Sequence, residues 1–287
     1  MAAKTPPARR IILGGWLRAA REAAGYTVKT AAAALETDAA QISRSENGLR
    51  LVRPGEVLKL LDIYGVKDPA RRARMKHLSQ SLSRKDWFDR YDSVLDERGA
   101  RDWLSLEQHA VWLRSYALSV VPGLIQTDQY ARAIFTRTRS GKTDDEIGQL
   151  VAARIERQRR LDDETSFRFR IVMDEAVLHR TIGGKFVHRA QLQRLVDITE
   201  GAIPAVTLQV LPFSVGAHDS LDGAFTILGF DHLSIADLVC VEGRRAGVVL
   251  SEPDDLRDYA NTFDQLMETA LSAADSRDLI DSVIKEM

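Results

Sequence analysis

Residues 17–66 read LRAAREAAGYTVKTAAAALETDAAQISRSENGLRLVRPGEVLKLLDIYGV, and this stretch decides the fold of the N-terminal part of the chain. Apolar residues recur at three- and four-residue spacing from Leu13 to Ala24, which predicts an amphipathic first helix that ends at Gly25. Four more helices follow, each with its own start or stop signal. We expect them at Thr27 to Ala34, at Ala39 to Glu46 before Asn47-Gly48, from Pro54 onward, and from Asp68-Pro69 onward.

The net charge of the chain conceals two opposed parts. The 287 residues include 40 basic and 41 acidic side chains, a formal balance of −1. Residues 1–84 hold 16 Lys and Arg against 7 Asp and Glu, whereas residues 85–287 hold 24 against 34, so the balances are +9 and −10. A compact basic module is the electrostatic footprint of a nucleic-acid binder. Charge alone does not distinguish such a module from a solvated charged surface. Together with the helical pattern, it predicts a basic DNA-binding domain over 1–84 and an acidic domain over 85–287.

Composition and the chain start exclude several protein classes. Hydrophobic residues make up 45% and charged residues 28%, so the chain as a whole is not disordered. Cys240 is the single cysteine, which excludes an intrachain disulfide. Arg18, Arg21 and Glu22 end the largely apolar run at residues 11–17 too early for a secretory signal or a membrane helix. We expect a cytoplasmic protein with no membrane partner.

The second and third helices are short and joined by a tight turn inside a basic helical unit, as helix-turn-helix DNA binding requires. The sequence also resembles the Xre-type (lambda-repressor-like) helix-turn-helix domain over about residues 9–66. The matching motifs are Leu17-Arg18-x-x-Arg21-Glu22-x-x-Gly25, Ile42-Ser43-Arg44, and Glu46-Asn47-Gly48 followed by a basic residue and Pro54. This resemblance implies an all-α, five-helix DNA-binding domain whose third helix enters the major groove of an operator.

The resemblance places Ala39, Ala40, Gln41 and Arg44 on the face that meets the bases. Gln41 suits a bidentate contact to adenine, and Arg44 suits guanine O6 and N7, a pairing worth about 1–3 kcal/mol of discrimination. The alanines offer only a methyl contact to thymine. Phosphate contacts are expected from Ser43, Asn47, Lys29, Arg50 and Arg53. For Lys29 and Arg50 an ordinary solvated charge is an equal alternative, whereas Ile42 is expected in the core and Glu46 in a structural role.

From about Asp86 the pattern changes to a mixture of strands and helices. Strands are expected at 110–116 and 167–171, and helices from Thr127 or Asp128, over 144–161 and around 192–198. Four short apolar runs at 206–211, 224–230, 238–241 and 247–250 indicate an antiparallel sheet or meander. A helix from Asp254 through Leu271 is expected to close the chain. The fold class is therefore an α+β domain with an antiparallel or mixed sheet after the helical domain.

The second half resembles the C-terminal domain of the WhiJ-like regulators of high-GC bacteria, a domain of unknown function. The resemblance rests on SYALSVVPGLIQTDQYARAIF, IVMDEAVLHRTIGG, LQVLPFSVGAHDSLDGAFTILGF and VCVEG. It implies a transcriptional regulator that is often encoded beside a small partner protein, in an arrangement likened to toxin–antitoxin pairs. It implies no established ligand and therefore no binding residues in this half.

No catalytic motif, metal-ligand spacing or cofactor loop is recognisable, so we predict no catalytic residues, metal or cofactor. The six histidines do not pair with Cys240 at metal-ligand spacing, and this cysteine is expected to be buried and inert. The alternative function is a DNA-tethered enzyme that uses Asp174, Glu175 and His179. The favoured function is a sequence-specific regulator, not an enzyme, that binds DNA as a homodimer. Its acidic domain is expected to sense a ligand or a small neighbour-encoded protein.

Overall fold

The computed structural model describes residues 8–81, 86–95, 100–162, 167–230, 237–241, 248–250 and 252–287. The chain forms two compact units. The first comprises residues 1–89, 100–109 and 230–236, and the second comprises 90–99, 110–229 and 237–287. The predicted domain boundary between residues 84 and 85 lies outside the described residues and stays a prediction.

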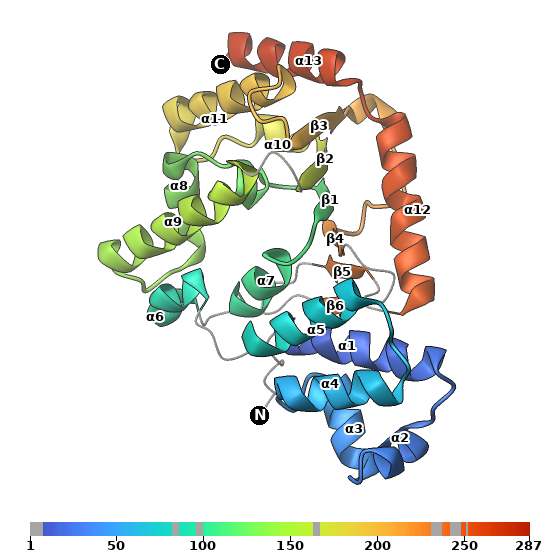
Figure 1. Cartoon of the computed structure of the whole chain (residues 1–287). Helices are drawn as coiled ribbons and strands as arrows, with labels where there is room; N and C mark the ends of the chain where they lie inside the picture. Colours follow the sequence, from blue (N-terminus) through green and yellow to red (C-terminus); the bar gives the residue numbers. More distant parts are fainter. Residues whose placement is uncertain are drawn as a thin grey trace. The chain divides into compact units, whose positions relative to one another are not determined.

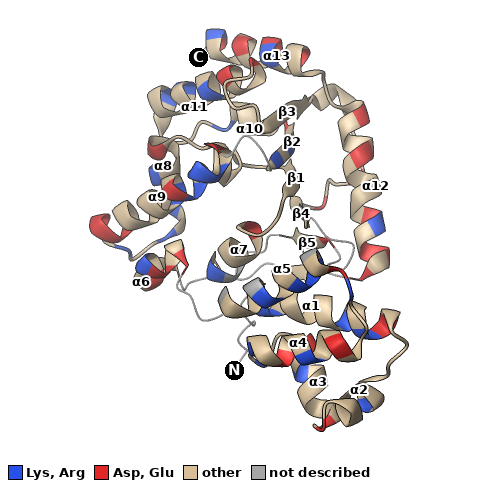
Figure 2. Cartoon of the chain, viewed as in Figure 1, with Lys and Arg blue, Asp and Glu red and all other residues tan. Residues whose placement is uncertain are grey.

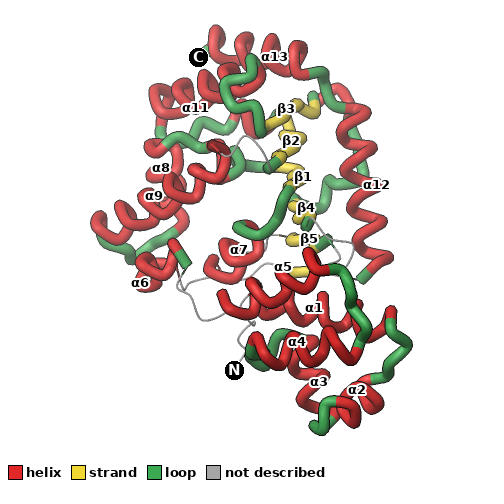
Figure 3. Tube along the Cα trace, viewed as in Figure 1, coloured by secondary structure: helices red, strands yellow, loops and turns green. Residues whose placement is uncertain are grey.

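The first unit is built from helices alone in its described part (Figures 1 and 3). All five predicted helices are present, and a further one at the start of the acidic half was not predicted. Their bounds are α1 Ala8–Ala23, α2 Val28–Ala34, α3 Ala39–Glu46, α4 Pro54–Ile63, α5 Pro69–Ser81 and α7 Ala100–Glu107. A 3-10 turn at Trp87–Tyr91 and the short α6, Asp92–Leu95, precede α7.

Local signals fix where these helices begin. Thr27 caps α2 in a capping box with Thr30, and Asp38 caps α3 by accepting the Gln41 N–H at 2.7 Å. Pro54 occupies the first turn of α4, where a missing N–H costs nothing. Because each signal lies within a few residues of the boundary it sets, the sequence alone was sufficient to place these helices.

Apolar side chains of α1, α3 and α4 meet in the core of the first unit. Leu13 and Leu17 of α1 and Val57 of α4 are almost fully buried. Ile42 of α3 is only 2% exposed, which confirms its predicted core position. Burial of a side chain of this size contributes about 1.5–3 kcal/mol, so Ile42 anchors α3 to the other helices.

The second unit contains one mixed six-stranded sheet. Its strands are β1 Trp112–Ala117, β2 Arg168–Asp174, β3 Val206–Leu211, β4 Phe225–Gly229, β5 Leu238–Val241 and β6 Val248–Leu250, in the order β3-β2-β1-β4-β5-β6. β1, β2 and β3 run parallel, and β4 to β6 are antiparallel to their neighbours. The chain is thus an all-α helix-turn-helix region followed by an α+β domain, as predicted.

The expected meander of four strands is wrong for β3. This strand pairs with β2 at the far edge of the sheet, and the chain then crosses β2 and β1 before β4 begins. Only β4, β5 and β6 form the meander, and Gly247 of the last predicted run lies outside the described residues. An apolar run in the sequence does not show which strand it pairs with. The parallel pairing of β3 with β2 depends on the crossover through α11, which lies between them in the chain.

Helices cover both faces of the sheet (Figure 1). On one face lie α8 Asp128–Thr138, α9 Asp144–Gln158 and α11 Gly184–Thr199, and on the other lies α12 Pro253–Thr269. Phe263 and Leu266 of α12 pack on Tyr116, Val172 and Phe225 of the strands. Short helical turns occur at Gly123–Ile125, Arg159–Asp162, Ala176–His179 (α10) and Phe213–Val215.

The chain closes differently from the prediction. α12 ends at Thr269, and a separate helix, α13 Ala273–Glu286, follows and packs on α11 and β3. The break is local: the Leu271 N–H donates to the Val210 carbonyl at 2.9 Å, and Ser272 caps the new helix. Leu271 continues the apolar period of α12, so periodicity alone extended that helix too far. No helix within the described ranges is both long and apolar enough to cross a bilayer.

Candidate nucleic-acid interface

The third helix of the first unit, α3, has one buried and one exposed face. Ile42, Ser45 and Glu46 are buried, whereas Ala39, Ala40 and Arg44 are exposed. Gln41 and Ser43 are partly exposed. The predicted base-facing residues therefore share the solvent side of one short helix.

A buried ion pair ties α3 to α1. The Arg21 guanidinium donates from Nε to Glu46 Oε1 at 2.7 Å and from its Nη2 atom to Glu46 Oε2 at 3.0 Å. Its Nη1 atom donates to the Tyr26 carbonyl at 2.8 Å. The hydrogen bond to Glu46 raises the pKa of Arg21 above its ordinary value. Two parallel hydrogen bonds fix orientation as well as distance, so Glu46 has the structural role that the sequence predicted for it.

Two further contacts hold the same pair of helices together. Arg18 donates to Asn47 Oδ1 at 2.7 Å, at the end of α3. Gly14 lies where the helices approach most closely, since a Cβ added there would be 2.4 Å from the Glu46 carbonyl oxygen. The orientation of α3 therefore depends on Arg18, Arg21 and Gly14, all on α1. The role of Gly14 was not predictable from the sequence, because a close backbone approach leaves no periodic signal.

The two predicted base readers differ in their freedom. Arg44 is exposed, and its side chain has no hydrogen bond or ion pair with any residue that the structure describes. Gln41 donates from Nε2 to Asp38 Oδ2 at 3.2 Å, so the N-cap carboxylate orients its amide. Both side chains rise from the exposed side of the helix. Arg44 is thus available to a ligand as it stands, and Gln41 is available in a fixed orientation.

The predicted phosphate contacts fall into two groups. Lys29 and Arg53 are exposed and have no partner among the described side chains, as a phosphate contact requires. Arg50 instead forms a bidentate pair with Glu56 at 2.5 and 2.9 Å, and this hydrogen bonding raises its pKa. Arg50 also donates to the Ser45 hydroxyl at 3.0 Å. In this structure the Arg50 guanidinium therefore links Ser45 of α3 to Glu56 of α4 and is already engaged within the fold.

Ser43 and Asn47 are linked to each other along α3. Asn47 donates from Nδ2 to the Ser43 carbonyl at 2.9 Å, and its Oδ1 accepts from Arg18. Ser43 is partly exposed. The Ser43 hydroxyl accepts from Asn47 Nδ2 at 3.4 Å and can still donate its own hydrogen to a phosphate, whereas a contact by Asn47 requires it to release Arg18.

Sequence reasoning identified the tight turn between α2 and α3 but assigned no role to Glu36 within it. Glu36 in this turn has a left-handed backbone with φ +56. After α3, Leu49 and Leu51 are 59% and 39% exposed on either side of Arg50. The sequence did contain a signal for this residue: helix-turn-helix turns often contain a glycine, and this turn has Glu36 instead.

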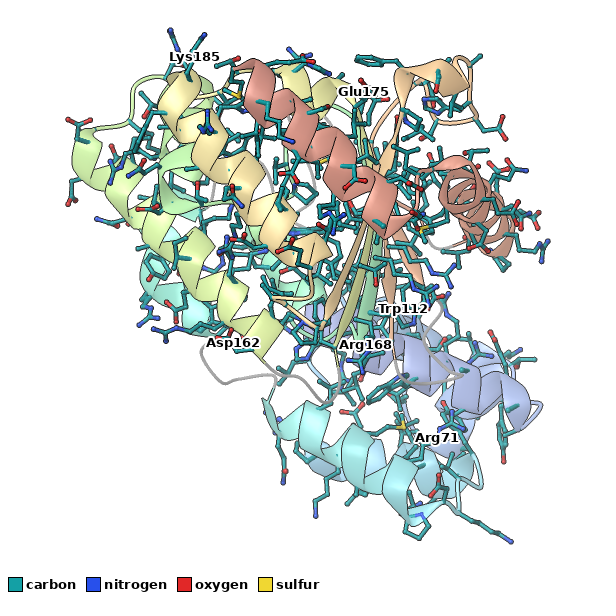
Figure 4. The ribbon with its side chains drawn as sticks, turned by 90° about the horizontal axis from the view of Figure 1, so that it is seen from above. Arg71, Trp112, Asp162, Arg168, Glu175 and Lys185 are labelled. Atoms are coloured by element: carbon teal, nitrogen blue, oxygen red, sulfur yellow. The ribbon has the colours of Figure 1, made fainter. Side chains whose placement is uncertain are left out.

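The alternative catalytic cluster in the second unit is engaged in local contacts. Asp174 accepts the Ala176 N–H at 2.8 Å and the Tyr116 hydroxyl at 3.3 Å. Glu175 accepts the Phe213 N–H at 2.7 Å and lies 3.3 Å from His179 Nε2. These contacts anchor α10 and the β3–β4 connection at the carboxyl end of β2. Figure 4 shows Glu175 at this end of the sheet, and Trp112 and Arg168 at the opposite end, where β1 and β2 start.

Cys240 is buried in β5, as predicted. The described residues contain no group of three or more His, Cys, Asp or Glu that could hold a metal ion. The carboxylates of the second unit thus offer no assembled metal centre within the described ranges.

Comparison with known families finds two matching domains in the chain. A helix-turn-helix domain matches residues 12–75, which include most of α1, all of α2 to α4 and part of α5. A domain of unknown function, DUF5753, matches residues 100–282, nearly two thirds of the sequence. The chain belongs to the DUF5753 family. Neither a curated protein nor a solved structure matches this DUF5753 protein. Its helix-turn-helix domain identifies it as a DNA-binding regulator.

Proposed function

We propose that this DUF5753 protein is a sequence-specific transcriptional regulator of the Xre type, in the WhiJ-like group, that inserts α3 into the major groove. One observation carries the proposal: the buried Arg21–Glu46 pair fixes α3 while Arg44 stays exposed and unpaired among the described residues. The +9 balance of residues 1–84 supports it, because phosphate attraction supplies much of the affinity for DNA. Such a protein acts in the compartment that holds the chromosome.

Within this proposal, the base readers are Gln41 and Arg44, with methyl contacts from Ala39 and Ala40. Ser43, Lys29 and Arg53 bind phosphates directly. Asn47 contacts a phosphate only if it releases Arg18, and Arg50 does so only if it releases Glu56. Few side chains then read the sequence, so specificity needs two copies of the helix-turn-helix on one operator. We therefore propose a homodimer.

Footprinting of the full-length protein on genomic DNA tests both parts of this proposal. We expect discrete sites that share a two-fold symmetric sequence, with half-sites about 10 base pairs or a multiple apart. Recovery of unpaired half-sites would contradict the homodimer. Recovery of no preferred sequence, with DNA binding that does not fall as salt rises, would contradict the regulator itself.

We further propose that the second unit senses a small neighbour-encoded protein or a ligand and has no catalytic role. Its acidic balance supports a protein partner, since such a surface is repelled from DNA. Acidic residues follow the exposed side of α12, at Asp254, Asp258, Asp264 and Glu268 (Figure 2). The engaged state of Asp174 and Glu175 supports a structural role for both.

The partner proposal is tested by adding the purified small protein that is encoded beside this chain to the protein–operator complex. We expect the operator affinity to change at least severalfold, because linkage requires a partner that prefers one state to alter DNA binding. Unchanged affinity together with no complex in size-exclusion chromatography would exclude that partner. A substrate turned over by the full chain but not by Glu175→Gln, with both proteins equally stable, would establish the enzyme instead.

A further inference from the structure

The first four helices of this protein end in the same hydrogen-bonded motif. After each helix, one N–H bonds back to the carbonyl three residues earlier, and the next N–H bonds back to the carbonyl five residues earlier. This Schellman arrangement requires a left-handed residue, which is usually glycine. Three of the four helices have it: Gly25 after α1, Gly48 after α3 and Gly65 after α4, with φ of +73, +71 and +66.

The exception is the end of α2, where Glu36 occupies the left-handed position with φ +56. Its N–H bonds the Ala33 carbonyl at 3.2 Å, and the Thr37 N–H bonds the Ala32 carbonyl at 2.9 Å. Within the described parts of the chain, no other non-glycine residue has a positive φ. A side chain in this conformation costs roughly 1–2 kcal/mol, because Cβ approaches the following carbonyl oxygen.

No contact with a described residue offsets that cost. Glu36 is exposed, and its carboxylate has no hydrogen bond or ion pair with any residue that the structure describes. Helix formation also gains nothing from it, since glycine serves the same motif at the three other ends. The described fold therefore gives no reason for a glutamate rather than a glycine at this position.

The position of Glu36 indicates what it acts on. It lies in the turn between α2 and α3, two residues before the N-cap Asp38 and close to Ala39 and Ala40. These residues begin the helix that, under the proposed function, enters the major groove. Under the proposed function, an exposed carboxylate beside the start of this helix lies near the phosphate backbone, where its charge opposes binding of any sequence.

We propose that Glu36 limits the DNA affinity of the helix-turn-helix unit by placing an unpaired negative charge at the rim of the recognition helix. This inference rests on the proposed DNA-binding function. Its consequence is that one module binds weakly, so that occupancy of an operator depends on pairing of modules and on control by the second unit.

Four side chains at position 36 separate charge from backbone strain. Glutamate is charged and strained, Glu36→Gln is neutral and strained, Glu36→Asp is charged but tolerates the left-handed region, and Glu36→Asn is neutral and tolerates it. The full-length variants are titrated onto operator DNA and onto unrelated duplex DNA at low and high salt, and their melting temperatures are compared. Arg44→Ala serves as the reference for the proposed function itself.

We expect affinity to follow charge and stability to follow backbone tolerance. Both neutral variants should bind either DNA about threefold more tightly at low salt, the size of one charge–phosphate interaction in water, with little difference at high salt. The Asp and Asn variants should melt about 2–4 °C higher than the Glu and Gln proteins. Equal affinity of Glu36→Gln and wild type, while Arg44→Ala still weakens operator binding, would overturn this inference alone. Indifference of DNA binding to Arg44→Ala would overturn the proposed function.

Discussion

At the scale of single residues, the buried Arg21–Glu46 pair is the interaction on which the DNA-reading face depends. Arg21 keeps only 8% of its side chain exposed and Glu46 only 4%. Removing one partner of such a pair leaves a buried charge without its counter-ion, which is far more costly than losing an exposed ion pair. Arg21 offers a direct comparison, because its Nη2 atom also lies 3.1 Å from Glu22, which is 59% exposed.

Glu46→Ala should therefore lower the free energy of unfolding by about 3 kcal/mol and weaken operator binding as well. Glu22→Ala, which removes an exposed acid from the same arginine, should cost less than about 1 kcal/mol. Urea denaturation of both full-length variants measures the difference. Similar costs for the two would show that Arg21 is not held by Glu46 as the structure has it.

At the scale of elements, α1 contains two adjacent glycines with opposite surroundings. At Gly14 an added Cβ would be 2.4 Å from the Glu46 carbonyl oxygen and 2.7 Å from that of Ser45. At Gly15 an added Cβ would have nothing within 4 Å. One glycine is thus required by the approach of α3, whereas the other only weakens the helix.

Gly14→Ala should destabilise the protein by about 1–3 kcal/mol, because backbone atoms of α3 must move, and should weaken operator binding. Gly15→Ala should stabilise it by about 0.5–1 kcal/mol, the ordinary gain of alanine over glycine inside a helix, and leave DNA binding intact. Thermal unfolding and mobility-shift titration measure both. A neutral Gly14→Ala would contradict the close packing of α1 on α3.

A second prediction at this scale concerns α11 and the loop after β1. Gln191 is fully buried, donates to the Ile125 carbonyl at 3.0 Å and accepts the Thr127 N–H at 2.7 Å. Gln191→Leu should cost about 1–3 kcal/mol, because it leaves the Thr127 N–H without its partner, whereas the Ile125 carbonyl still accepts from Arg194 Nε at 3.1 Å. Gln193→Leu, at an exposed position of the same helix, should stay within about 0.5 kcal/mol of wild type. Equal effects in urea denaturation would exclude the network.

Elements were predictable where their signals are local. Thr27, Asp38 and Pro54 mark helix starts, and the alternation from Phe167 to Ile171 marks β2, whose exposed Arg168 and Arg170 confirm a half-exposed start. What sequence reasoning missed depends on distant partners. The edge position of β3 depends on its crossover helix, and the end of α12 depends on the hydrogen bond from Leu271 to Val210.

The candidate site was predictable only in outline. The sequence correctly placed Arg44 and Gln41 on the exposed face of α3, because helical spacing alone determines which residues share a face. The sequence could not predict that Arg50 pairs with Glu56 or that Asn47 accepts from Arg18. Both contacts join side chains across a loop or between two helices. Residue type gives a charge or a hydrogen-bonding group, and only the fold determines whether that group is already engaged.

At the scale of the whole molecule, the formal balance of −1 conceals +9 in residues 1–84 beside −10 in residues 85–287. DNA affinity should therefore arise from the basic part and fall steeply with salt, by about 0.9 in log K per unit of log salt for each phosphate neutralised. Arg53→Ala should reduce this slope by about one and weaken operator and unrelated DNA alike. Mobility-shift titrations over a series of salt concentrations measure the slope. A slope that stays unchanged would remove Arg53 from the contact surface.

The most direct test of the central claim is a fluorescence-anisotropy titration that measures how strongly the full-length protein prefers its footprinted operator to a scrambled duplex. Arg44→Ala should lower this preference by about tenfold or more, because a bidentate arginine–guanine contact is worth about 1–3 kcal/mol. Lys67→Ala removes one exposed positive charge from the turn before α5 and should leave the preference unchanged. An Arg44→Ala protein that keeps the wild-type preference would contradict the assignment of α3 as the helix that reads DNA.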